Sequence, residues 1–132
     1  MRTPRAAVML ALGVGIVAAA ILWHWRPEPA RRPVRVPELS ADAVVGKRVF
    51  DLSCAGCHGE NAAGTAAGPS LIHPVYRPAL HADIAFELAV RRGVRAHHGR
   101  FADMPPQPAV PQVEVARITR YVRELQRANG IE

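Results

Sequence analysis

The chain contains only two cysteines, and both lie in one short motif. A zinc site with four ligands would need more cysteine or a paired-histidine pattern elsewhere, so the sequence excludes one. Aromatic residues make up only 5% of the sequence, so a small domain has little side-chain volume with which to fill a core. No segment alternates between apolar and polar residues, which argues against a sheet-based fold.

The two cysteines belong to Cys54-Ala55-Gly56-Cys57-His58, a C-x-x-C-H motif. Two thiols at this spacing can form thioethers with two vinyl groups of one porphyrin, and the next histidine can then bind the iron. The motif predicts one covalent haem c, attached through Cys54 and Cys57 with His58 as an iron ligand. Such a group would also supply the missing apolar volume. A thioredoxin-like dithiol is the alternative, but no β-rich run precedes Cys54.

The formal net charge of +6 lies mostly in the first part of the chain. From Ser40 onward, eleven lysines and arginines are set against nine aspartates and glutamates, so this region carries only +2. A nucleic-acid-binding domain would concentrate basic residues among aromatic ones. We therefore expect no nucleic-acid partner.

Residues 6–25 form an apolar run without a formally charged side chain. As a helix of about 30 Å this run would cross the hydrocarbon core of a membrane. Trp23 and Trp25 lie at its end, where interfacial aromatic residues are found. Residues 1–25 are therefore predicted to be an N-terminal membrane anchor, or an uncleaved signal. A cleaved signal peptide is the alternative, because Ala18-Ala19-Ala20 offers small residues for cleavage.

Residues 26–39 are rich in proline and arginine, a composition typical of an extended, semi-rigid linker. The arginines either lie along anionic lipid headgroups or are solvated.

Residues 40–132 are expected to form the single folded domain. Ser40 is a suitable N-cap for a helix from Ala41 to about Cys54, in which Val45, Val49 and Leu52 recur at helical spacing. The haem motif lies at the end of this helix.

Two further helices are predicted. One runs over residues 83–92, with Ile84 and Leu88 at i, i+4 and Gly93 as its stop signal. The other begins near Pro111 and continues to about residue 129. Three helices with long loops and no strand pattern predict an all-α domain.

With these pieces in place, residues from about Ser40 to Ile131 resemble a class I c-type cytochrome, a small monohaem electron carrier. The matching segments are Gly46-Lys47-Arg48-Val49-Phe50 before the haem motif, Gly68-Pro69-Ser70-Leu71 and Met104-Pro105 after it, and Ile118-Thr119-Arg120-Tyr121-Val122 near the end. The resemblance implies a small, all-α, cytochrome c-like helical domain around one covalent haem. An N-terminal transmembrane helix would precede this domain.

The resemblance also implies that Gly46 and Phe50 lie where the first and last helices cross, with Tyr121 as the aromatic partner. Residues 95–100 depart from commoner members, so the resemblance assigns no donors to the haem propionates.

The resemblance further implies that the Pro69 carbonyl accepts a hydrogen bond from Nδ1 of His58, and that Met104 is the second axial ligand. Met104 is also the one methionine that lies beyond the N-terminal apolar segment. The rival ligands are the other imidazoles of the domain, which are His73, His81, His97 and His98. The resemblance favours Met104 as the second axial ligand. So does the fact that no other methionine lies in the domain.

With both axial positions filled, the iron would have no position open to a substrate. We therefore expect an electron carrier rather than an enzyme, with redox proteins as partners and no small-molecule substrate. These partners would be a membrane oxidoreductase or a periplasmic dehydrogenase. The alternative is a haem enzyme or gas sensor with an open or labile sixth position.

The predicted orientation in the membrane rests on two signals that disagree. Four arginines follow the apolar run and two precede it, so the positive-inside rule alone would place the domain in the cytoplasm. In the family that the chain resembles, haem is attached on the other side of the bacterial inner membrane. We therefore expect a single-pass protein of that membrane with its haem domain in the periplasm.

Overall fold

The computed structural model describes residue 9 and residues 15–17, 19–23, 33–97 and 101–132. The chain divides after Arg32, and the unit Pro33–Glu132 contains the C-x-x-C-H motif. Much of the predicted anchor, and residues 26–32 of the predicted linker, lie outside the described residues. In the part that is described, no helix is long and apolar enough to cross a membrane.

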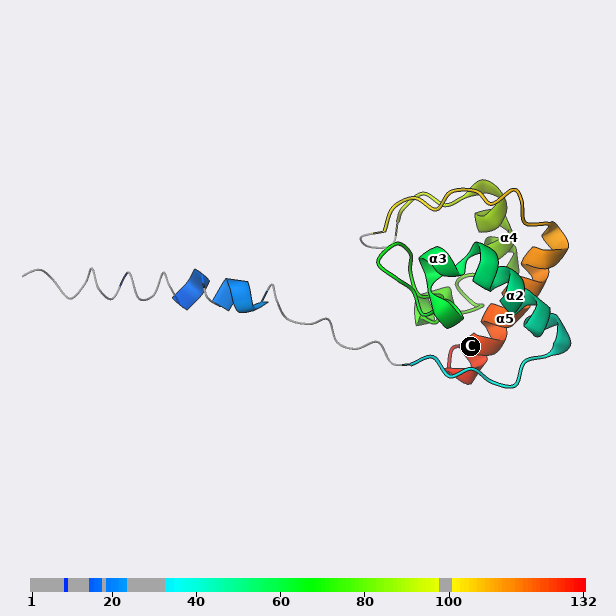
Figure 1. Ribbon diagram of the computed structural model, residues 1–132, viewed down its shortest axis with the longest axis horizontal. Helices are drawn as coiled ribbons and strands as arrows, with labels where there is room; N and C mark the ends of the chain where they lie inside the picture. The colour runs from blue at the N-terminus through cyan, green and yellow to red at the C-terminus, as the bar shows by residue number, and fades with distance from the viewer. Residues whose placement is uncertain (1–8, 10–14, 18, 24–32, 98–100) are drawn as a thin grey trace, which may run out of the picture. The chain divides into compact units, whose positions relative to one another are not determined.

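The unit Pro33–Glu132 is built from helices, as predicted (Figure 1). Its described elements are α2 (Ala41–Ser53), α3 (Ala55–His58), η1 (Glu60–Ala62), η2 (Pro74–Tyr76), α4 (Asp83–Arg92) and α5 (Gln112–Ala128). The η elements are single turns of 3-10 helix. One antiparallel β-bridge, between Val94 and Met104, completes the regular structure of the described residues in this unit.

Helix α2 begins at the predicted N-cap. The hydroxyl oxygen of Ser40 accepts a hydrogen bond from the backbone N–H of Ala43 at 3.3 Å. The same hydroxyl donates to Oε1 of Glu124 in α5 at 2.7 Å. The cap therefore also ties the start of α2 to α5.

The buried face of α2 differs from the face that the larger apolar residues suggested. Ala43, Gly46 and Phe50 are buried, whereas the side chain of Leu52 is 89% exposed. The face toward α5 begins with two small residues, which allow the two backbones to approach closely. Of the larger residues that predicted the helix, Val49 packs against the core, whereas Leu52 lies away from it.

The crossing of α2 and α5 is a contact between backbones. A Cβ atom at Gly46 would lie 2.0 Å from the carbonyl oxygen of Arg117, so only glycine fits there. Next to it, the rings of Phe50 and Tyr121 meet edge to face with centroids 5.6 Å apart. The expected roles of Gly46, Phe50 and Tyr121 at this crossing are confirmed.

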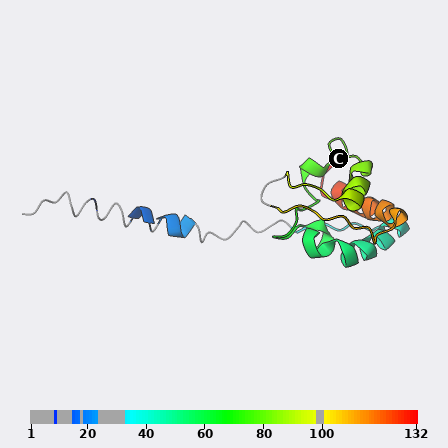
Figure 2. The ribbon, with the colours of Figure 1, turned by 90° about the horizontal axis from the view of Figure 1, so that it is seen from above.

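Helix α5 contacts α2 and also α4 (Figure 2). Its buried residues include the apolar series Val115, Ile118, Val122 and Leu125, which recurs at helical spacing. On α4, Val90 is buried, whereas Ile84 is 57% exposed.

Residues 33–39, at the end of the predicted linker, lie against α5. Asn129 accepts a hydrogen bond from the backbone N–H of Arg35 at 3.0 Å and donates one to its carbonyl at 2.9 Å. Val34 and Leu39 pack against the core. This part of the chain is therefore in contact with the domain.

We predict that Gly46→Ala lowers the free energy of unfolding by on the order of 3 kcal/mol, because its methyl group forces α2 away from the Arg117 carbonyl. Urea unfolding followed by far-UV circular dichroism measures this change. Gly56→Ala is the control, because no atom outside its own helical turn lies within 4 Å of the added Cβ. The control should leave stability unchanged or raise it by up to about 1 kcal/mol. Equal effects of the two substitutions would contradict the proposed close approach.

We predict that Tyr121 makes the domain sensitive to alkaline pH. Burial raises the pKa of Tyr121, and the carboxylates of Asp51 and Glu60 raise it further. Tyrosine in the unfolded chain ionises near pH ~10. The stability that the neutral phenol contributes is therefore complete below pH ~10 and is lost as the pH rises toward the folded-state pKa.

The test compares Tyr121→Phe with the wild type by urea unfolding, from neutral pH to pH ~12. Near neutral pH, the substitution should cost about 0.5–1.5 kcal/mol, because the hydroxyl loses its hydrogen bond to Oδ1 of Asn61 at 3.2 Å. Above pH ~10, the wild type should lose stability faster than the variant. If the free energy of unfolding falls equally with pH in both proteins, Tyr121 does not cause the alkaline sensitivity.

Candidate functional site

The C-x-x-C-H motif begins where α2 ends. Cys54 is both the C-cap of α2 and the N-cap of α3, with φ −121° and ψ −33°. This non-helical residue separates the two helices, so the motif forms a short helix of its own. Cys54 is half-buried, whereas Cys57 is exposed.

Burial raises the pKa of the Cys54 thiol to about 11, and the neighbouring Cys57 adds to the shift. Redox dithiols of the thioredoxin type depend on a lowered thiol pKa. The environment of Cys54 therefore argues against the dithiol alternative.

The loop after the motif folds back onto it. The hydroxyl of Thr65 donates to the carbonyl of Cys57 at 2.6 Å. Nδ1 of His58 lies 2.9 Å from the carbonyl oxygen of Pro69. A carbonyl can only accept, so this hydrogen bond places the proton on Nδ1 and leaves Nε2 with a free lone pair.

A cavity of about 400 Å³ lies beside the motif. On one side it is lined by Phe50, Cys54, His58 and Pro69, and on another by the α4 residues Ala85, Phe86, Leu88, Ala89 and Val90. Most of these side chains are apolar. The volume is within the range of about 300–1,000 Å³ that is typical of cofactor sites.

Met104 also lines this cavity. Its backbone pairs with Val94, and the two N–H···O distances are both 2.9 Å. Two residues beyond Pro105, the backbone N–H of Gln107 donates to the carbonyl of Val90 in α4 at 2.7 Å. The sequence predicted only a loop here, because a single bridged pair has no alternating pattern that would reveal it.

The sequence profile of the cytochrome c family matches residues 43–126, which is more than half of the chain. The chain belongs to the cytochrome c family. The family and the two cysteines together imply that it carries covalent haem c. Comparisons with curated proteins and with solved structures found no match.

Membership identifies the general role of the protein as haem-based electron transfer. Members of the family are typically electron carriers, with redox proteins as partners. Cytochrome c domains are extracytoplasmic.

The residues of this cytochrome c fit haem. An apolar cavity adjoins Cys54, and the cavity is lined by an imidazole and a thioether, two groups that bind haem iron. Of the five predicted site residues, the structure brings Cys54, His58, Pro69 and Met104 to one cavity. Cys57 lies on α3 beside it, and its side chain is exposed.

The rival histidines have different surroundings. His81 and His97 line the cavity, whereas His73 is not part of its lining and accepts a hydrogen bond from the N–H of Val75. His98 lies outside the described residues. His81 does not cap α4, because the N-cap position is Ala82 and Nδ1 of His81 lies 2.7 Å from the carbonyl of Val75.

Sequence reasoning did not identify the aromatic lining of the cavity. Tyr76, Phe86 and Phe101 all contribute to it, from η2, α4 and the segment before Met104. The chain has few aromatic residues, and these three lie outside the predicted helix crossing. Their presence there could have indicated a second apolar site.

We predict that Gly93 controls the position of Met104. Gly93 has a φ of +72°, and a Cβ atom there would lie 2.5 Å from the carbonyl oxygen of Met104. Gly93→Ala should therefore break the Val94–Met104 bridge. Amide hydrogen exchange at Val94 and Met104 would measure this change. The protection factors of both amides should fall at least about tenfold.

Gly130→Ala is the matched control. Gly130 also has a positive φ, +74°, but no atom lies within 4 Å of an added Cβ. This variant should show the cost of a strained backbone, about 1–2 kcal/mol, without faster exchange at the bridge. Undiminished protection of both amides in Gly93→Ala would contradict the prediction.

Proposed function

We propose that this cytochrome c transfers electrons through one haem whose iron is held by His58 and Met104. The observation that carries the proposal is that both side chains line one apolar cavity and come from separate parts of the fold. His58 ends α3, and Met104 is attached to the C-terminal side of α4 through its bridge to Val94.

The chain's own groups would tune the cofactor. When bound, the haem supplies an iron that exchanges one electron. The hydrogen bond from Nδ1 of His58 to Pro69 orients the imidazole and increases its basicity. The thioether of Met104 favours ferrous over ferric iron and so raises the reduction potential. The apolar lining limits access of water to the site.

We also propose a location and partners for the protein. Residues 1–25 would form a single-pass anchor and residues 26–39 a linker, with the haem domain (40–132) on the periplasmic side of the bacterial inner membrane. Support comes from the apolar run without formal charge and from the proline-rich composition that follows it. The partners would be a membrane oxidoreductase or a periplasmic dehydrogenase.

The test of axial ligation is Met104→Ala in the full-length holoprotein. Haem should remain attached, because Cys54 and Cys57 are unchanged. The ferrous form should bind CO, and the ferric charge-transfer band of the iron–thioether bond should disappear. The reduction potential should fall by a measurable part of the roughly 0.8 V that axial ligands span.

His97→Ala is the control, because His97 also lines the cavity. It should keep the charge-transfer band and should not bind CO. The assignment fails if Met104→Ala keeps the wild-type spectrum and potential while His97→Ala or His81→Ala changes both. CO binding by the wild type itself would instead favour a haem enzyme or gas sensor with an open position.

A further inference from the structure

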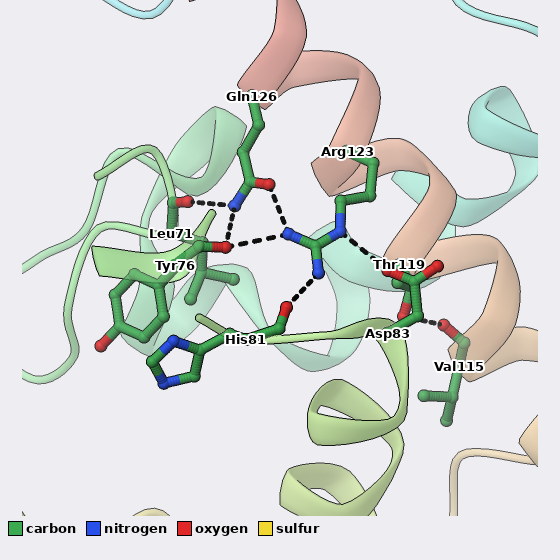
Figure 3. A network of polar contacts seen from close by, with 8 residues as sticks. All are labelled: Leu71, Tyr76, His81, Asp83, Val115, Thr119, Arg123 and Gln126. Carbon is green, nitrogen blue, oxygen red and sulfur yellow. Dashed lines mark hydrogen bonds and ion pairs between the residues drawn. The ribbon is translucent and has the colours of Figure 1, made fainter. Parts of the chain in front are cut away.

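Arg123 is a charged residue of α5 that is not assigned to the haem site, yet its side chain is only 7% exposed. A buried guanidinium is tolerated only when its donors are satisfied. In this chain Nε donates to Oδ1 of Asp83 at 2.8 Å, and Nη1 donates to the carbonyl of Tyr76 at 2.9 Å. Nη2 donates to the carbonyl of His81 (Figure 3).

Gln126, on the next turn of α5, extends this network. Its side-chain oxygen accepts a hydrogen bond from Nη1 of Arg123 at 2.6 Å. Its amide nitrogen donates to the carbonyls of Leu71 at 2.9 Å and Tyr76 at 3.1 Å. Figure 3 shows Arg123 and Gln126 reaching from α5 to the same stretch of backbone.

The carbonyls that the two side chains hold belong to residues 71–81, which lie between the haem-motif loop and α4. The regular structure of this stretch is the single turn η2, so most of its carbonyls have no helical partner. Leu71, Tyr76 and His81 also line the haem cavity. The network therefore holds the backbone that forms one wall of that cavity.

Two further contacts extend this support to side chains of the wall. The ring of Phe86, another lining residue, has its centroid 4.8 Å from Cζ of Arg123 in a cation–π arrangement. The rings of Tyr76 and His81 lie against each other with centroids 5.1 Å apart, and Nδ1 of His81 is bound to the carbonyl of Val75. Fixing the backbone at Tyr76 and His81 thus also fixes the relative position of these two rings.

We propose that Arg123 and Gln126 are positioning residues for the haem. By holding the carbonyls of Leu71, Tyr76 and His81, they keep this wall closed against the haem and limit access of water to it. The inference rests on the proposed function only in placing the haem in this cavity. Because water and polar surroundings favour ferric iron, a loosened wall lowers the reduction potential.

The experiment measures the reduction potential, the Soret circular dichroism and the thermal unfolding of the full-length holoprotein with Arg123→Gln. We expect a lower potential and a changed Soret signal. Arg123→Lys keeps the charge but cannot reproduce the planar set of donors, so it should not restore the wild-type potential. Gln126→Leu is a milder variant, which decides the question if Arg123→Gln does not fold.

Two controls on α5 separate positioning from general stability and charge. Val122→Ala removes volume from the core away from the cavity lining, so it should lower the unfolding temperature without changing the potential. Arg120→Gln removes an exposed charge from the same helix and should change neither quantity. The proposal is overturned if Arg123→Gln and Gln126→Leu behave like Val122→Ala, with lower stability but unchanged potential and Soret signal.

The same measurements distinguish this inference from the axial assignment. Loss of the iron–thioether band in Met104→Ala, with an unchanged potential in Arg123→Gln and Gln126→Leu, would reject the positioning role alone. A shifted potential in the Arg123 and Gln126 variants, with an unchanged band in Met104→Ala, would support the positioning role and reject Met104 as the ligand.

Discussion

The approach of α2 to α5 at Gly46 is the contact on which the rest of the domain depends. With no side chain at Gly46, the backbone of α2 lies against the carbonyl of Arg117, and Phe50 can reach Tyr121. Helix α2 ends at Ser53, about one turn after Phe50, and Cys54 is its C-cap, so this crossing also positions the haem motif relative to α5. Phe50 and Ile118 belong both to the buried core and to the cavity lining. The same residues therefore pack the core and line the cofactor site.

The scarcity of aromatic residues has a structural explanation in this domain. Each phenylalanine and tyrosine of the chain either packs at the α2–α5 crossing or lines the cavity: Phe50, Tyr76, Phe86, Phe101 and Tyr121. A small domain buries a limited fraction of its surface. A covalent porphyrin supplies the apolar volume that the side chains do not, so the cofactor contributes to the core as well as to electron transfer.

The two sides of the cavity are held by backbone groups. His58 is oriented by the carbonyl of Pro69, and Met104 is paired with Val94 through two backbone hydrogen bonds. A third wall is held by α5 through Arg123 and Gln126. Each of these contacts uses a backbone group and so restricts motion around the cavity. A site built in this way suits electron transfer, in which the surroundings of the iron should change little.

The sequence alone determined the haem motif and the three longer helices. These features depend on short-range spacing or on the chemistry of a local motif. The place of Gly46 at the helix crossing was implied by the resemblance to class I c-type cytochromes. The outward position of Leu52, the Val94–Met104 bridge and the burial of Arg123 were decided only by the tertiary structure. Arg123 lies more than 40 residues from the carbonyl of His81 that it binds, and no local pattern encodes such a pairing. Which face of a helix is covered, and which charge is buried, depends on the neighbouring segment that the fold brings to it.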